Sequence, residues 1–141
     1  MRRLLSATAA LLATLLCLTG ASLAALDWPQ YLGEGRDGVY KGPPLADAWP
    51  AGGPRVLWKK PVGQGFSGPV VAAGKLILHH RVGAEEVVEA MDIKTGASQW
   101  RYAYPTTYRD DFGFDEGPRA VPVVANGIVY TFGAQGQLHA V

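Results

Sequence analysis

The densest group of side chains able to bind or react lies between residues 104 and 119. It contains the charged residues Arg109, Asp110, Asp111, Asp115, Glu116 and Arg119, set among the aromatic residues Tyr108, Phe112 and Phe114. Long connections often carry function, so one interpretation is a loop that contacts a ligand or a partner. The simpler alternative is a solvated loop whose arginines pair with its own acids. Because the acids lack the regular order of a calcium-binding loop, no metal site is predicted.

Two short sequences match motifs of nucleotide-binding proteins by letter only. Residues 63–68 have the glycine spacing of the dinucleotide fingerprint, but such a loop must open a helix. Pro-Val-Val at 69–71, followed by a glycine hairpin, predicts a strand instead. Residues 111–113, Asp-Phe-Gly, have the sequence of the kinase magnesium motif, but the other kinase motifs are absent from the chain. Neither sequence predicts a nucleotide site.

Histidine and cysteine provide no metal site and no catalytic set. His79 and His80 are adjacent, so in a strand they point to opposite faces and cannot bind one metal together. His139 is isolated, and Cys17, the only cysteine, lies near the N-terminus. No serine–histidine–acid set and no nucleophile elbow can be assigned. The sequence therefore identifies no catalytic residue.

Residues 1–24 have the properties of a signal peptide. Arg2 and Arg3 form a positive start, a long apolar run follows, and Ser22-Leu23-Ala24 offers small residues for cleavage. We expect a periplasmic or secreted protein without a membrane span after cleavage, and we favour an uncleaved signal anchor less. Without the two arginines, eleven of the thirteen basic residues remain against twelve acids, a net charge of −1. That balance predicts no nucleic-acid partner.

The rest of the chain has the pattern of an all-β protein. Short runs rich in β-branched and aromatic residues are bounded by glycine or proline, and helical spacing is hard to find. Ala73-Gly74 and Asn126-Gly127 predict two-residue hairpins. The expected strands are residues 56–59, 69–72, 75–80, 86–91, 98–102, 121–125, 128–132 and 137–141. Together they predict an antiparallel meander.

Residues 90–100 form the most informative turn. Asp92 is placed to accept a hydrogen bond from the backbone two residues on, and Thr95 can add a hydroxyl contact. Gly96 supplies the positive φ that a tight turn needs. Trp100 carries a large flat surface that must pack against a neighbour. We therefore expect a strand, a tight turn and the start of the next strand.

An internal repeat covers most of the predicted strands. Residues 69–77 match residues 122–130, a spacing of 53, whereas Ala90 and Ala140 are 50 residues apart. We attribute the three-residue difference to a longer turn around residues 82–85 in the first copy. Four short strands in a unit of about 40 to 50 residues are typical of a propeller blade.

The turn resembles the tryptophan-docking motif of the pyrroloquinoline-quinone (PQQ)-like β-propeller repeats. The matching positions are Ala90, Asp92, Thr95, Gly96 and Trp100, with Trp58 standing before the first unit as Trp100 stands before the second. Residues 27–33 and 36–39 also resemble the N-terminus of a secreted subgroup of these proteins. The resemblance implies a lead-in at 25–54 and the first antiparallel four-stranded blades at 55–141. Fewer than two full blades are present, so we expect an N-terminal fragment of a longer protein.

The resemblance leaves two functions open. We favour a non-enzymatic interaction or scaffold module outside the cytoplasm, whose partners are the missing downstream blades and other envelope proteins. The alternative is a quinoprotein dehydrogenase that uses PQQ and calcium to oxidise an alcohol or a sugar. Many such enzymes carry a vicinal cysteine pair, which is absent here, and no base or calcium ligand can be matched. No cofactor is therefore identified, and PQQ and calcium belong only to the alternative.

Overall fold

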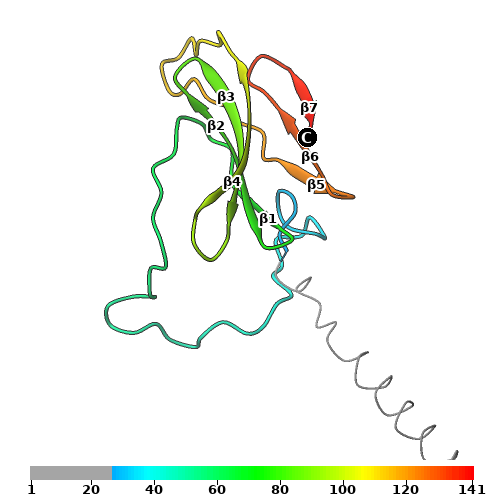
Figure 1. Ribbon diagram of the computed structural model, residues 1–141. Coiled ribbons are helices and arrows are strands. Elements are labelled where there is room, and N and C mark those ends of the chain that lie inside the picture. The colour runs from blue at the N-terminus through cyan, green and yellow to red at the C-terminus, as the bar shows by residue number, and fades with distance from the viewer. Residues whose placement is uncertain (1–26) are drawn as a thin grey trace, which may run out of the picture.

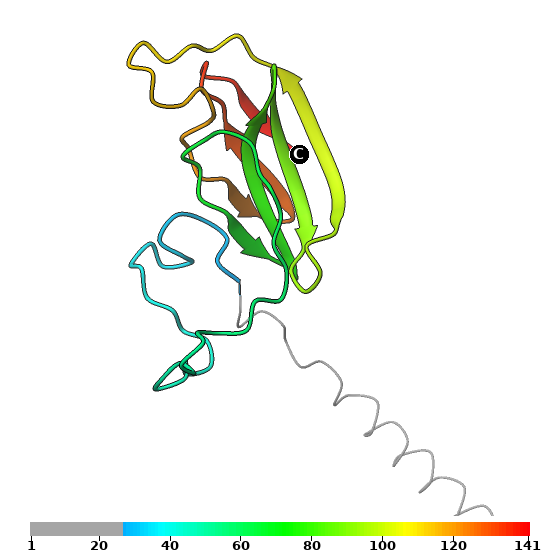
Figure 2. The ribbon, with the colours of Figure 1, turned by 90° about the vertical axis from the view of Figure 1, so that its left-hand side faces the viewer.

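The computed structural model describes residues 27–141, and the predicted signal peptide at 1–24 lies outside the described residues. The described part is all-β and folds into two antiparallel sheets, which confirms the predicted fold class at this level. Figures 1 and 2 show the two sheets as stacked layers. No helix within residues 27–141 has the length and apolar character needed to cross a bilayer.

The first sheet has four strands and the second has three, each in sequence order. The first sheet consists of β1 (Val70–Ala72), β2 (Lys75–Val82), β3 (Glu85–Asp92) and β4 (Ser98–Pro105). The second consists of β5 (Val123–Ala125), β6 (Ile128–Phe132) and β7 (Leu138–Ala140). The meander expected from the sequence is therefore present.

The first hairpin of each sheet has the two-residue turn that the sequence predicts. Ala73 and Gly74 connect β1 to β2 with φ values of 49° and 73°. Asn126 and Gly127 connect β5 to β6 with φ values of 52° and 77°. Positive φ at both central residues is the geometry of a type I′ turn, whose twist matches that of the flanking strands.

The expected longer turn around residues 82–85 is wrong. Only Gly83 and Ala84 separate β2 from β3, whereas residues 133–137 separate β6 from β7. The first unit is longer because β2 and β3 have eight residues each, while β6 has five and β7 has three. The extra residues extend the strand pairing and place a tight turn at its end.

The apolar core lies between the two sheets. Its fully buried members are Val70, Ile77, Val88, Ala90 and Val129. Half-buried residues of β4, β5 and the segment before β5 pack against them: Trp100, Tyr102, Val121 and Val124. Alternate residues of each strand point to the same face, so one face of the first sheet provides most of this core.

The strand expected at residues 56–59 is absent. This segment is extended but has no strand partner, and it lies on the face of the first sheet that is turned away from the second. Two contacts hold it there: Trp58 Nε1 donates to the Ile93 carbonyl at 3.0 Å, and Lys60 Nζ lies 2.6 Å from Glu89 Oε1. A strand requires a neighbouring edge, and side-chain docking on a sheet face supplies none.

The lead-in joins the β1 and β5 ends of the two sheets. Trp28 exchanges two backbone hydrogen bonds with Val71 of β1, and the Pro29 carbonyl accepts one from Val124 of β5. The Asp27 carboxylate also accepts a hydrogen bond from the Ala73 amide. The rest of the expected lead-in, up to residue 54, has no strand and is mostly exposed.

Candidate functional site

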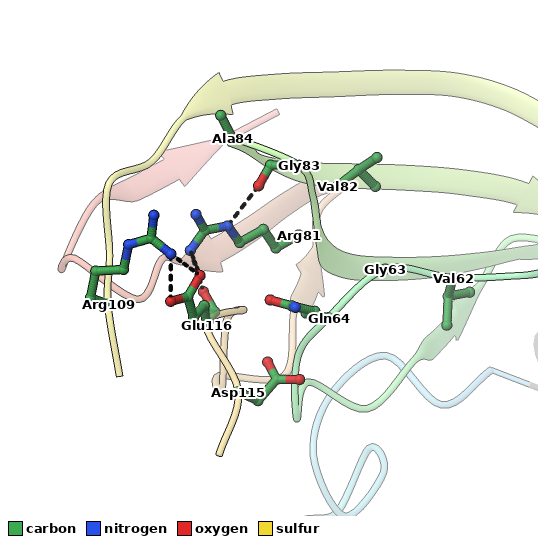
Figure 3. Close-up of a pocket in the computed structure, with 10 residues that line it drawn as sticks. All are labelled: Val62, Gly63, Gln64, Arg81, Val82, Gly83, Ala84, Arg109, Asp115 and Glu116. Carbon is green, nitrogen blue, oxygen red and sulfur yellow. Dashed lines mark hydrogen bonds and ion pairs between the residues drawn. The ribbon is translucent and has the colours of Figure 1, made fainter. Parts of the chain in front are cut away.

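An open hollow of about 790 Å³ lies where the β2–β3 turn meets the predicted charged loop. Three segments line it: residues 62–64, residues 81–84, and Arg109, Asp115 and Glu116 of the loop. Figure 3 shows Arg81 and Arg109 converging on the carboxylate of Glu116. The structure therefore brings part of the predicted loop against the end of the first sheet.

Arg81 fastens the loop to the sheet. Its guanidinium donates to the Gly83 carbonyl at 2.9 Å, to the Tyr108 carbonyl at 2.8 Å and to the Glu116 carbonyl at 3.0 Å. Its side chain is buried and also lies 3.4 Å from a carboxylate oxygen of Glu116. A buried arginine needs this many partners. Sequence reasoning missed Arg81, which lies just beyond the strand expected at residues 75–80 but inside β2.

The loop arginines pair with acids of the same loop. Arg109 Nη1 contacts the two carboxylate oxygens of Glu116 at 2.8 and 2.9 Å, and this carboxylate raises the pKa of Arg109. Arg119 Nη2 lies 2.9 Å from Asp110 Oδ1. The Arg119 guanidinium also lies 5.2 Å from the ring centre of Tyr108, within cation–π range. These pairs agree with the simpler alternative for the loop.

The loop acids also order the backbone. Asp110 Oδ2 accepts a hydrogen bond from the Phe114 amide, and Asp115 Oδ1 accepts one from the Gly117 amide, each at 2.7 Å. Asp111 is exposed at the tip. The structure thus engages Arg109, Asp110, Asp115 and Arg119 in bracing the loop. Their partners within the loop leave them less free to hold a ligand.

Two aromatic side chains project from this braced loop. Phe112 is 82% exposed and Phe114 is 78% exposed. Their ring centres are 6.3 Å apart and their planes are inclined by 27°. Large apolar side chains that stay exposed on a well-braced loop are typical of a contact surface.

The turn after β3 has the contacts that its sequence predicts. Asp92 Oδ1 accepts hydrogen bonds from the Lys94 amide, the Thr95 amide and the Thr95 hydroxyl, at 2.9, 2.9 and 3.0 Å. These bonds, above all those from Thr95, lower the pKa of Asp92. Gly96 has a φ of +70°. The turn is therefore locally determined.

The tryptophan that packs on this turn is Trp58. A Cβ added to Gly96 would lie 2.7 Å from Cδ2 and Cε3 of the Trp58 indole, so the ring covers the glycine. Trp100 instead points from β4 towards the second sheet, where it lines a small cavity with Val124 and Val129. Ala90 is fully buried and pairs with Trp100 across β3 and β4. Each tryptophan thus packs on a different sheet.

A buried polar cluster joins the sheets and was not anticipated from the sequence. Glu86 Oε2 accepts a hydrogen bond from the Tyr104 hydroxyl at 2.5 Å and lies 3.3 Å from His79 Nε2. Glu86 Oε1 accepts a bond from the Ala134 amide in the β6–β7 connection. Burial lowers the pKa of His79 to about 4 and raises that of Tyr104. Glu86 and His79 have no exposed surface, so the cluster stabilises the contact between the sheets.

The remaining sequence motifs have structural roles. His79 faces this cluster, whereas His80 accepts a hydrogen bond from the Gly63 amide on the opposite face, as expected. No helix follows residues 63–68, and the Phe66 amide bonds to the Pro118 carbonyl. Within residues 27–141, no three His, Cys, Asp or Glu side chains gather to hold a metal ion.

Comparison with known proteins found no match for the chain among protein-family models, curated proteins or solved structures. The loop at residues 104–119 is braced by ion pairs and exposes two aromatic rings, and it lies beside the hollow lined by Arg81, Arg109 and Glu116. The hollow is lined by two arginines and two acids, so its formal charges balance.

Proposed function

We propose that the chain is a non-enzymatic interaction module that acts outside the cytoplasm, built from PQQ-like propeller repeats. One observation carries the functional part: a loop braced by ion pairs exposes Phe112 and Phe114. Because the loop is already ordered, a partner that covers the two rings gains apolar burial at a small cost in conformational entropy.

The repeat geometry supports the propeller part of the proposal. Residues 69–77 and 122–130 form equivalent hairpins, one in each sheet. Ile77 of the first sheet faces the second sheet, whereas its repeat equivalent Tyr130 faces outward. A stack with this head-to-tail sense continues by adding further sheets, as propeller blades do.

The quinoprotein alternative gains no residue from the described part of the chain. A calcium ion needs several oxygen ligands that converge, whereas Asp110, Asp115 and Glu116 already bind groups of their own loop.

The test places a photo-crosslinking amino acid at Asp111, next to the two rings, in the 141-residue chain expressed in cells that export it. We expect an adduct with one identified envelope protein. The adduct should disappear in the double variant F112S/F114S and persist in the matched double variant V56S/L57S, whose apolar residues are exposed elsewhere. An adduct that survives F112S/F114S, or no adduct at all, contradicts the proposed contact surface.

Enzymatic activity is tested separately. The purified chain, and any longer form of it, is assayed for dye reduction with alcohols and sugars in the presence of PQQ and calcium. We expect no reduction above the protein-free rate. Reduction that requires both PQQ and calcium would replace the proposed function with the dehydrogenase.

A further inference from the structure

The contact between the two sheets changes character along its length. Towards the β1–β2 and β5–β6 hairpins it is apolar, and there Ala90 is in register with Ile77 on one side and Trp100 on the other. Towards the β2–β3 turn it is polar, and there Glu86 is in register with Tyr104. We propose that the polar end is an acid-sensitive latch, which opens when His79 takes up a proton while the apolar end stays closed.

The latch consists of His79, Glu86 and Tyr104 of the first sheet and of the Ala134 amide and His139 of the second. His79 Nε2 lies 3.1 Å from the Tyr104 hydroxyl and 3.3 Å from Glu86 Oε2. Across the sheets, the Ala134 amide donates to Glu86 Oε1 at 2.9 Å, and the ring centres of His139 and Tyr104 are 4.1 Å apart. Figure 1 shows the β6–β7 connection, which contains Ala134, at the end of the sheets away from the lead-in. The two cross-sheet contacts therefore require that the sheets are together at this end.

A proton on His79 finds no acceptor in the closed latch. The side chain has no exposed surface, and its Nε2 already faces Tyr104 and Glu86. Its other ring nitrogen, Nδ1, is buried and has no hydrogen-bond partner among residues 27–141. Protonation at Nδ1 therefore creates a buried, charged donor that is left unsatisfied, which is costly in a protein interior.

The ionisable groups around His79 do not remove this cost. The groups that share its face of the first sheet, approach it from the second sheet or stand next to it in β2 are Glu86, Tyr102, Tyr104, His139, His80 and Arg81. Burial has the largest effect and lowers the pKa of His79 to about 4, although the Glu86 carboxylate acts in the opposite direction. His80 and His139 lower the pKa further. Closure of the latch thus disfavours the charged imidazole.

The other end of the sheet contact has no such group. Its core is aliphatic and aromatic, and backbone hydrogen bonds pin it to the lead-in. Trp28 exchanges two of these bonds with Val71 of β1, and the Pro29 carbonyl accepts one from Val124 of β5. Neither apolar side chains nor backbone amides titrate between pH 7.5 and pH 5. Acid therefore acts on one end only, and the sheets should open there like a hinge.

The two pKa values of His79 set the size of the response. The pKa is about 4 in the closed latch and about 6.5 once water solvates the ring. Because the closed form has the lower pKa, the contribution of His79 to closure is complete above pH 6.5 and is lost as the pH falls towards 4. At pH 5 the ratio of open to closed forms should be about 30-fold higher than at pH 7.5.

The test is amide hydrogen exchange, followed by mass spectrometry of peptide fragments, on the whole chain at pH 7.5 and pH 5. Rates are corrected for the pH dependence of the intrinsic exchange rate. Fragments that contain Ala134 report on the latch, because the bond from this amide crosses the sheets, and fragments that contain Val124 report on the other end. At pH 5, protection should fall about 30-fold at the latch and less than about threefold at the other end.

Two histidine variants assign the response. H79Q keeps a neutral polar side chain and removes the proton site, so protection at the latch should no longer depend on pH. H80Q is the matched control, because His80 lies on the opposite face and bonds to the Gly63 amide, and it should respond as the parent chain does. Unchanged latch protection in the parent chain, equal losses at both ends, or an H79Q response equal to that of the parent would each overturn the proposal. If H79Q fails to fold, the parent chain and H80Q still decide, since a response that H80Q abolishes does not come from His79.

Discussion

The packing of Trp58 on Gly96 gives the sharpest test of how the chain is held together. In G96A, an ordinary residue must adopt a φ of +70°, which costs roughly 1–2 kcal/mol. The new Cβ would also lie 2.7 Å from the Trp58 ring, and such overpacking costs about 1–3 kcal/mol more. We expect G96A to lower the free energy of unfolding by about 3 kcal/mol.

A double-mutant cycle separates the two costs. W58A alone should cost about 2 kcal/mol, less than a fully buried tryptophan, because the ring is half-buried and makes one hydrogen bond. In the W58A background, G96A should cost only the backbone component, roughly 1–2 kcal/mol. The assay is urea unfolding followed by far-UV circular dichroism at low micromolar concentration. If the loss of unfolding free energy in the double variant W58A/G96A equals the sum of the two single losses within about 0.5 kcal/mol, the ring does not pack on the glycine.

Three further predictions concern the other sheet contacts and the loop. W100A should lower the free energy of unfolding by about 3 kcal/mol in the urea assay, and a loss below about 1 kcal/mol would show that the ring does not join the sheets. His79 has a folded pKa of about 4 against about 6.5 when unfolded, so its contribution is complete above pH 6.5 and is lost as the pH falls towards 4. By linkage, His79 makes the free energy of unfolding about 3 kcal/mol higher above pH 6.5 than at low pH. In H79Q, the free energy of unfolding should therefore fall by about 3 kcal/mol less over this pH range than in the parent chain. R81M should release the loop, so trypsin should cleave after Arg109 and Arg119 several times faster than in the parent chain, whereas an unchanged rate would show that Arg81 does not brace it.

Much of the secondary structure was predictable because its causes are local. Asn126-Gly127 and Asp92 with Gly96 determine their turns through short-range backbone chemistry, and the flanking runs alternate in a strand pattern. The strand expected at 56–59 failed for the opposite reason. Its residues suit a strand, but strand formation depends on an edge that the sequence segment does not contain.

The candidate site was predicted only in part. The loop residues Arg109, Asp110, Asp115 and Arg119 were recognised as a group, but their mutual pairing depends on how the loop folds back. The anchoring arginine, Arg81, lies 28 positions before Arg109, and nothing in the local sequence connects them. The exposure of Phe112 and Phe114 likewise depends on how the whole loop folds.

By itself, the sequence determined the all-β class, the repeated hairpins and the geometry of the turn at residues 92–96. Hydrogen bonds and φ preferences over a few residues are sufficient for these. Only the tertiary structure decided that Trp58 covers Gly96, that Trp100 lies between the sheets, and that Glu86 links β3 to the β6–β7 connection. Those contacts join residues far apart in the chain, and their partners are set by the order and stacking of whole sheets.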